Sequence, residues 1–206
     1  MPNKTKFTFV KVLSLVVTAA GLAVMAGWIF DFVLIKSIAP AFVSMKFSTA
    51  FAFMVSGISL YFLARAREGE FEKAQVALSI TSFILAILMG LFFFSALFGI
   101  ETGVENLFVK DSGDAKSVVA GMPSVPTMIS FLLIALAGII TILNPAGVIT
   151  MLKIIGGLVG VICALAAIGY VFSAPMLYYF IPGANSAMAL HTALLFVIMG
   201  TGLLCL

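Results

Sequence analysis

A short pattern that occurs three times constrains this chain more than any single residue does, because one structural unit is then used three times. In each copy, a methionine is followed four or five residues later by a threonine, and a phenylalanine follows four residues after that. Residues four apart share one face of a helix. Each copy also follows a glycine that stands beside a large apolar residue. The copies are Met45/Thr49/Phe53, Met122/Thr127/Phe131 and Met188/Thr192/Phe196, after Gly27-Trp28, Gly99-Ile100 and Gly169-Tyr170 respectively.

The composition places the chain in a membrane. It is 63% hydrophobic and 9% charged, with a mean hydropathy of +1.27. A soluble domain carries about 25% charged residues, so this chain has too few to cover a surface that faces water. The net charge of +3 is small and spread over the loops, so no nucleic-acid partner is implied. A single histidine excludes a multi-histidine metal or haem site, and no cofactor is expected.

A helix that crosses a membrane needs about 20 mainly apolar residues. Six such stretches alternate with long and short connections, which predicts an all-α integral membrane protein. The expected architecture is six transmembrane helices, built as three two-helix repeats with long outer connections in a single domain, 1–206. The spans are about 10–30, 47–65, 75–98, 126–143, 148–172 and 188–206, the long connections are 31–46, 99–125 and 173–187, and the repeats cover about 10–66, 75–143 and 148–206.

The distribution of basic residues predicts the orientation. Seven basic residues lie at the N-terminus and in or beside the short turns, against four in the long connections. By the positive-inside tendency, both termini are cytoplasmic and the protein is a multi-pass protein of the inner (cytoplasmic) membrane. A cleaved signal peptide is disfavoured, because the first apolar stretch is longer than a usual signal core and ends in the repeated glycine–aromatic pair. The seven are Lys4, Lys6, Lys11, Arg65, Arg67, Lys73 and Lys153; the four are Lys36, Lys46, Lys110 and Lys116.

Two interpretations of the threonines stay open. A threonine at a helix start can act as the N-cap and satisfy an unpaired backbone N–H. Three equivalent threonines and their methionines can also surround a shared apolar pocket, since methionine adapts to irregular apolar ligands and the hydroxyl adds one directional hydrogen bond. We therefore predict a site for a small hydrophobic or amphiphilic ligand beneath the outer connections. Its lining would come from Met45, Thr49, Thr127, Met188, Thr192, Trp28 and Tyr170.

Polar residues near the expected helix ends are further candidates. Asp31 and Glu101 hold corresponding places after their glycine signatures, and Glu105 shares a helical face with Glu101. Carboxylates can act in acid–base chemistry or bind cations, although a wetted, outward-facing helix at the membrane surface explains Glu105 more simply, and the corresponding places of Asp31 and Glu101 suit a shared structural role. His191 is the one side chain with an ordinary pKa near neutrality. A GxxxG pair, Gly156 and Gly160, suits close packing within the chain or in a homodimer.

No constellation of catalytic residues is present. The sequence lacks a nucleophile elbow, a Walker loop and a zinc-protease motif, and its two cysteines are not spaced from the histidine as a nucleophile and base would be. We therefore expect neither an enzyme activity nor a metal site in this chain.

Longer motifs carry a resemblance to a known type of membrane region. The stretch Leu97–Phe108, LFGIETGVENLF, and the segments MKFSTAFAFMVSGISL, MPSVPTMISFLLIALAGI and MALHTALLFVIMGTGLL resemble the multi-helix N-terminal sensor regions found ahead of PAS, histidine-kinase or GGDEF modules in bacteria and archaea. Met128 and Ser48 depart from the usual Ala and Asn of that pattern. The resemblance implies the signal-input domain of a histidine kinase or diguanylate cyclase, as in two-component signal transduction, with the sixth helix leading into a further module.

Two other classes of function remain as alternatives. A small membrane transporter would fit three two-helix repeats, but the spans lack both mid-membrane charges and the Pro-x-acid-x-x-basic signature of mitochondrial carriers. A structural membrane subunit needs no particular motif.

Overall fold

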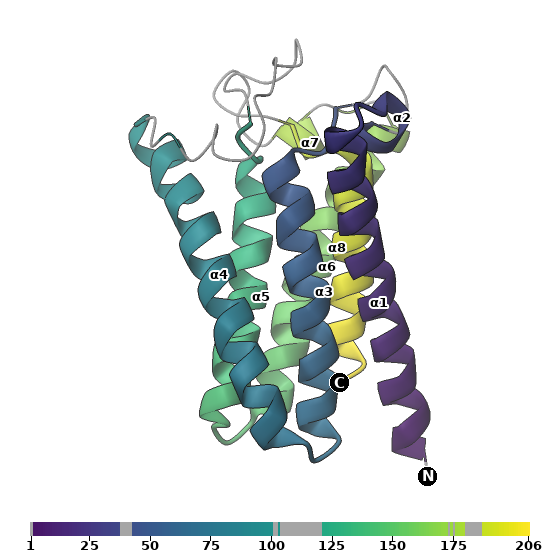
Figure 1. Ribbon diagram of the computed structural model, residues 1–206, viewed down its shortest axis with the longest axis vertical. Coiled ribbons are helices and arrows are strands. Elements are labelled where there is room, and N and C mark those ends of the chain that lie inside the picture. The colour runs from purple at the N-terminus through teal and green to yellow at the C-terminus, as the bar shows by residue number, and fades with distance from the viewer. Residues whose placement is uncertain are drawn as a thin grey trace.

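A computed structural model shows an all-helical chain (Figure 1). The structure describes residues 2–37, 43–100, 103, 121–172, 174, 176–179 and 187–206. Within these ranges there is no strand, and each stretch expected to cross a membrane forms a helix. The helices are α1 (Pro2–Ile29), α2 (Val33–Lys36), α3 (Phe47–Arg67), α4 (Phe71–Phe98), α5 (Val125–Leu143), α6 (Val148–Val171), α7 (Met176–Tyr179) and α8 (Leu190–Leu204).

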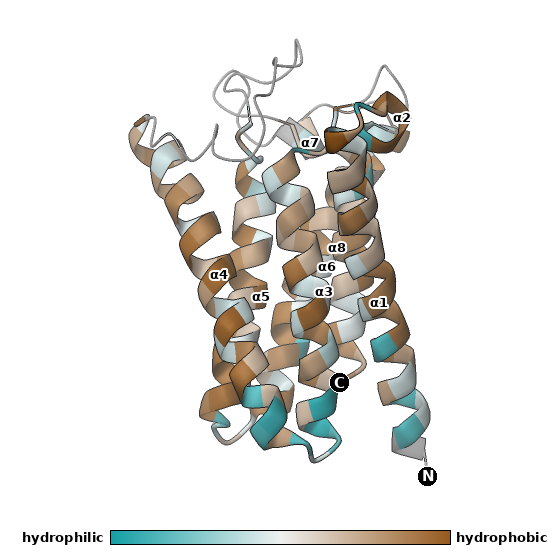
Figure 2. Ribbon diagram, viewed as in Figure 1, coloured by the Kyte–Doolittle hydropathy of each residue, from teal (hydrophilic) through white to brown (hydrophobic). Residues whose placement is uncertain are grey.

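Length and composition make this a membrane protein. Five helices, α1, α3, α4, α5 and α6, are long and apolar enough to cross a bilayer, and α8 is an apolar helix of 15 residues. Many large apolar side chains are exposed on the long helices, and most residues of these helices are coloured as hydrophobic in Figure 2. Phe83 on α4 and Ile154 on α6 are 66% and 58% exposed. Such a surface is stable against lipid rather than water.

The long helices form an inner and an outer set. The most apolar part of α3 is 67% buried and that of α5 is 56% buried, whereas the values for α1, α4 and α6 lie between 28% and 33%. α8 joins the inner set, because more than half of its residues are buried. The main contacts run in a closed circle, α1–α3–α4–α5–α6–α8–α1, and α3 also contacts α5 and α8 across the centre. Each outer helix therefore packs between two inner helices.

One end of the bundle holds both termini and both tight turns (Figure 1). Here Gly69 and Gly147 adopt φ values of 104° and 83°, which suit glycine. Ion pairs fasten the same end, with Lys11 bound to Glu68 and Arg65 bound to Glu70. Figure 2 shows hydrophilic residues gathered at this end. α2 and α7 lie at the opposite end of the bundle. We call it the outer end, after the orientation predicted from the sequence; the term is separate from the outer helices α1, α4 and α6.

Glycines bring an inner and an outer helix into backbone contact in two of the pairs. A Cβ atom at Gly57 of α3 would lie 2.7 Å from the carbonyl oxygen of Ser14 in α1. A Cβ atom at Gly200 of α8 would lie 2.7 Å from the carbonyl oxygen of Gly156 in α6. Gly57 and Gly200 each stand eight residues after the threonine of their own copy. The GxxxG pair therefore packs against α8 of the same chain.

Candidate functional site

The three repeated threonines all occupy the third position of an inner helix. Thr49 is the third residue of α3, Thr127 of α5 and Thr192 of α8. The N-cap interpretation was wrong, because the N-caps are Lys46, Ser124 and Ala189, and none of these makes a side-chain capping hydrogen bond. The two residues before each threonine are already helical. This includes Pro126, whose missing N–H costs nothing in a first turn.

The three repeated phenylalanines meet at the centre of the bundle. Their ring centroids lie 4.8 Å apart for Phe53 and Phe131, 4.6 Å for Phe53 and Phe196, and 4.6 Å for Phe131 and Phe196. All three side chains are completely buried. Each is the seventh residue of its helix, so the three inner helices approach one another at the same level. We call this cluster the phenylalanine triad.

The threonines form the next layer towards the outer end. Each lies four residues before its phenylalanine and so shares its face, about 6 Å further along the helix. Exposure is 3% for Thr49 and 2% for Thr127 and Thr192. The Thr127 hydroxyl lies 2.7 Å from the Ser124 hydroxyl. We call these three residues the threonine layer.

The methionines of the pattern are held in extended segments by aromatic side chains. The Trp28 Nε1 donates a hydrogen bond of 2.8 Å to the Met45 carbonyl, and the Tyr170 hydroxyl donates one of 2.7 Å to the Met188 carbonyl. Trp28 and Tyr170, predicted as ligand-binding residues, therefore fasten the outer helices to the segments that precede α3 and α8. The two methionine side chains are 1% exposed. At the corresponding place in the middle copy stands Ile100, which is 51% exposed and has no polar donor in its side chain.

Asp31 forms a small polar cluster at the outer end with Lys36 and Trp28. The Lys36 Nζ lies 2.5 Å from the Asp31 Oδ1 and 4.7 Å from the centroid of the Trp28 ring. The hydrogen bond from Lys36, and then its positive charge, lower the pKa of the exposed Asp31 carboxyl below its ordinary value. Asp31 has a φ of 57°, a left-handed conformation that aspartate tolerates better than most residues. Glu101 and Glu105 lie outside the described residues.

His191 is the second residue of α8 and stands beside the threonine layer. Its Nε2 atom is buried, and no hydrogen-bond partner for it occurs in the part of the chain that the structure describes. The sequence singled out this residue as a polar group at a helix start.

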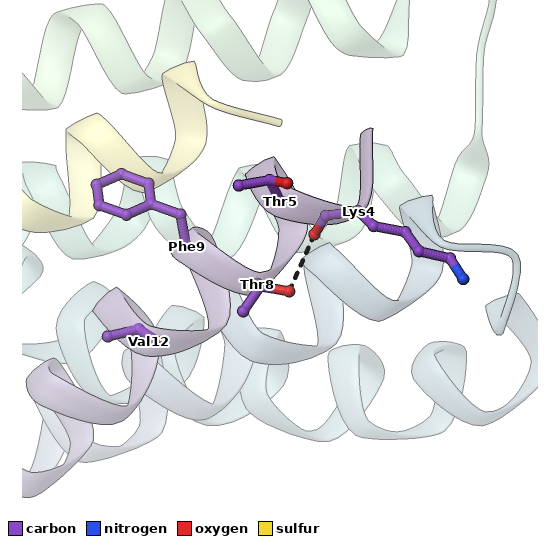
Figure 3. Close-up of a pocket in the computed structure, with 5 residues that line it drawn as sticks. All are labelled: Lys4, Thr5, Thr8, Phe9 and Val12. Atoms are coloured by element: carbon purple, nitrogen blue, oxygen red, sulfur yellow. Dashed lines mark hydrogen bonds between the residues drawn. The ribbon is translucent and has the colours of Figure 1, made fainter. Parts of the chain in front are cut away.

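Two surface clefts lie away from the threonine layer. One, of about 440 Å³, is lined by a single face of α1, where the Thr8 hydroxyl donates a hydrogen bond of 2.9 Å to the Lys4 carbonyl (Figure 3). The other lies at the turn between α3 and α4, around Gly69 and Lys73. Neither contains a residue of the predicted ligand site, and the first offers side chains of one helix only.

Five of the residues predicted to bind a ligand lie buried at the starts of the inner helices: Met45, Thr49, Thr127, Met188 and Thr192. The predicted site did not include the phenylalanine triad, although the pattern contained those residues. Ser124, which contacts Thr127, was also missed. No protein-family model, curated protein or solved structure matches this chain.

Proposed function

We propose that this chain is a membrane-embedded signal-input domain of the kind that serves histidine kinases or diguanylate cyclases, and that it detects a hydrophobic or amphiphilic ligand or a membrane state. In this proposal, α8 together with the buried residues 187–189 forms the sixth span. The observation that carries it is the phenylalanine triad, which joins the starts of all three inner helices.

Equivalent contacts in the three helix pairs support an origin from one repeated unit. The pairs are α1–α3, α4–α5 and α6–α8, and each contributes one phenylalanine to the triad. In the first and third pairs, a glycine eight residues after the threonine contacts the outer helix. In the same two pairs, an aromatic donor binds the methionine carbonyl. Contacts that recur at equivalent positions are not expected from composition alone.

The arrangement suits sensing better than transport. The spans carry no charged residue near mid-membrane, whereas transporters commonly place ionisable groups there. The triad fills the centre of the inner helices one turn below the threonine layer. A ligand at the threonine layer would contact the starts of three helices together. Such a ligand shifts the bundle between two packings only if it binds one of them more tightly, by a few kcal/mol for a complete shift.

Cytoplasmic termini complete the proposal. The seven basic residues that predict this orientation come from the N-terminus and from helix ends and turns at the end shown hydrophilic in Figure 2. The test uses single cysteines in a variant in which Cys163 and Cys205 are replaced by alanine. Cysteines at Lys4 and Gly69 should resist an impermeant thiol reagent in intact cells, and one at Asp114 should react. The opposite labelling pattern would show the orientation to be wrong.

Movement of α8 tests the sensing function directly. The native Cys205 follows α8, and a second cysteine at Gly69 marks the turn after α3. Spin labels at both sites, in a Cys163→Ala background, report the distance between these helix ends in nanodiscs. We expect a hydrophobic amphiphile to change the distribution of distances. A distribution unchanged by dodecanoate and by dodecanol would contradict sensing of amphiphiles.

A further inference from the structure

We infer that water is bound inside the bundle between α3, α4 and α5, where the hydroxyls of Ser56, Ser59 and Ser82 hold it. The site lies on the other side of the phenylalanine triad from the threonine layer. It does not depend on the sensing function, because it follows from the burial and the hydrogen bonding of three side chains.

The three serines carry buried hydroxyls without a partner. Ser56 and Ser59 on α3 are completely buried and Ser82 on α4 is 1% exposed, and the Oγ atom of each forms no hydrogen bond to any described residue. By contrast, the hydroxyls of Ser130 and Thr141 on α5 donate to the carbonyl four residues earlier, at 2.7 and 2.8 Å. A buried hydroxyl without a partner costs free energy, because lipid and apolar side chains cannot accept its proton. The three serines therefore require a polar partner.

Helix geometry directs the two serines of α3 towards α4 and the centre. Gly57 faces α1, and Ser59 lies two residues further, about 200° around the helix. Ser59 is therefore directed away from α1, and the helix that contacts α3 on that side is α4 (Figure 1). Ser56 lies about 60° from Ser59 in one direction and about 60° from Phe53 in the other. Because Phe53 is at the centre, Ser56 lies between the centre and α4, where α3 also contacts α5.

Ser82 reaches the same level from α4. A Cβ atom at Gly138 of α5 would lie 2.0 Å from the Ser82 hydroxyl oxygen, so this hydroxyl lies against α5. Gly138 stands seven residues after the triad phenylalanine of α5, and Ser59 stands six residues after that of α3. α3 and α5 begin at the same end and their phenylalanines are in contact, so both residues lie about 10 Å from the triad. Ser56 lies about one turn nearer to it. The three hydroxyls thus converge on one region between three helices.

Water suits this region better than a cation or an organic molecule. Each serine hydroxyl can donate one hydrogen bond and accept two, and a buried water needs two to four polar partners. Glu72, in the first turn of α4, is the only acidic residue of α3, α4 and α5, so a dehydrated cation would lack a compensating charge. Leu78 and Leu85, on either side of Ser82 along α4, are completely buried. Among such apolar neighbours, the further polar groups of an organic molecule would stay unpaired.

The bound water links α4 to the inner helices. Trp28 and Tyr170 fasten α1 and α6 to the segments that precede α3 and α8, whereas Ile100 offers no polar donor at the corresponding place after α4. A water at Ser82 supplies a polar contact in the pair that lacks the aromatic one. It does so where α4 packs directly on α5.

A double-mutant cycle tests whether two of the hydroxyls share the water. The variants are Ser59→Ala, Ser82→Ala and the two together, each unfolded as the full chain in mixed micelles. If the first substitution releases the water, the second has little left to remove. We therefore expect the combined effect on the unfolding equilibrium constant to differ about tenfold from the product of the single effects.

Ser130 supplies the matched control for this cycle. It is as buried as Ser82, but its hydroxyl binds the Pro126 carbonyl and lies 3.6 Å from the Cys163 sulfur of α6. The effects of Ser82→Ala and Ser130→Ala should therefore multiply. Effects that also multiply for Ser59→Ala and Ser82→Ala would overturn the shared water, because hydroxyls that bind only their own helices act independently.

Radiolytic labelling of the wild-type protein in nanodiscs detects the water itself. X-rays split a bound water into hydroxyl radicals that oxidise the nearest side chains, whereas radicals from the solvent do not reach a core enclosed by lipid. Oxidation of Leu78 and Leu85 is compared with that of Leu152, which is equally buried on α6. We expect several-fold more oxidation of the two α4 leucines. Equal protection of all three would overturn the site, and this comparison needs no serine variant to fold.

Sodium is the other ligand that neutral hydroxyls can hold. Unfolding of the wild type in sodium chloride and in choline chloride of equal ionic strength separates the two ligands. Equal unfolding midpoints are expected for a site that binds water. A higher midpoint in sodium chloride, absent from the variant with both Ser59→Ala and Ser82→Ala, would show that a cation occupies the site and that the assignment to water is wrong.

Discussion

Gly156 and Gly157 are neighbours on α6 that should respond oppositely to the same change. A Cβ atom at Gly156 would lie 2.8 Å from the Gly200 carbonyl oxygen and 3.1 Å from the Leu204 backbone nitrogen. These are backbone atoms, which cannot rotate away as a side chain does. A Cβ atom at Gly157 would meet nothing within 4 Å. Alanine at the first position therefore forces α6 and α8 apart, and alanine at the second does not.

The expected magnitude comes from two terms. Replacing glycine by alanine inside a helix gains up to about 1 kcal/mol from helix propensity. An extra methyl group in a well-packed interface costs about 1–3 kcal/mol. The propensity term is shared by the two variants, so the difference between them measures the steric term alone. We expect Gly156→Ala to be about 1–3 kcal/mol less stable than Gly157→Ala, with Gly157→Ala at or above wild type.

Unfolding of the purified protein in mixed micelles, followed by circular dichroism, measures this difference. Size-exclusion chromatography with light scattering accompanies it, because a GxxxG pair can also join two chains. Equal stability of the two variants would refute the close approach of α6 and α8. Loss of a dimer by Gly156→Ala alone, with unchanged unfolding of the monomer, would show that the motif serves association instead.

Three further predictions concern the outer half of the bundle. Phe131→Ala should destabilise the protein by about 3–5 kcal/mol, because it leaves a cavity in the completely buried triad. Phe94→Ala, at a 48% exposed position, should cost far less, and unfolding curves of the two variants measure the difference. Tyr170→Phe removes the hydroxyl that binds the Met188 carbonyl and should cost about 1 kcal/mol by the same measurement, so a neutral effect would contradict that bond. The pKa of Asp31 is lowered in the folded state, so its contribution to stability is present above the ordinary pKa and declines as pH falls through the folded value. Melting temperatures from about pH 6 to pH 3 should therefore fall slightly more for wild type than for Asp31→Asn.

The sequence predicted where the helices lie because apolar stretches of sufficient length have few other structures in a membrane. Hydropathy did not indicate which helices are inside. α3 has a mean hydropathy of 1.7 and is 67% buried, whereas α4 has 2.5 and is 33% buried. The more polar helix is internal because small residues, such as the buried Ser56 and Ser59, let helix backbones approach closely.

The sequence predicted part of the arrangement at the starts of the inner helices, for a reason visible in its residues. The spacing of threonine and phenylalanine placed both on one face, and the structure gathers the three phenylalanines. The roles of Trp28 and Tyr170 were not predictable, because they depend on the backbone carbonyls of extended segments. The sequence did not show that each threonine is the third residue of its helix, because a threonine at the N-cap and one two or three residues later are followed by similar apolar sequences. Only the backbone conformation separates them.

The middle pair departs from the other two in ways that affect its outer half. Ala135 of α5 occupies the position of Gly57 in α3 and Gly200 in α8. Ile100, just after α4, corresponds in the repeat to Trp28 of α1 and Tyr170 of α6. Neither the glycine contact nor the aromatic hydrogen bond is therefore available there. α4 and α5 instead approach each other in the halves away from the outer end, where a Cβ atom at Gly138 would lie 2.0 Å from the Ser82 hydroxyl oxygen. Towards the outer end, α4 leans away from α5 (Figure 1).

Local opening should consequently begin at the outer end of α4. Opening free energy depends on the buried contacts that must be broken, and residues 91–98 of α4 include fewer buried residues than residues 21–28 of α1 or 163–170 of α6. Phe94, Leu97 and Phe98 are 48%, 64% and 63% exposed. Hydrogen exchange in nanodiscs should therefore be faster in residues 91–98 than in residues 21–28 or 163–170. Slower exchange in α4 would mean that the two substitutions in the middle pair do not loosen it, and that the three pairs hold the outer end equally.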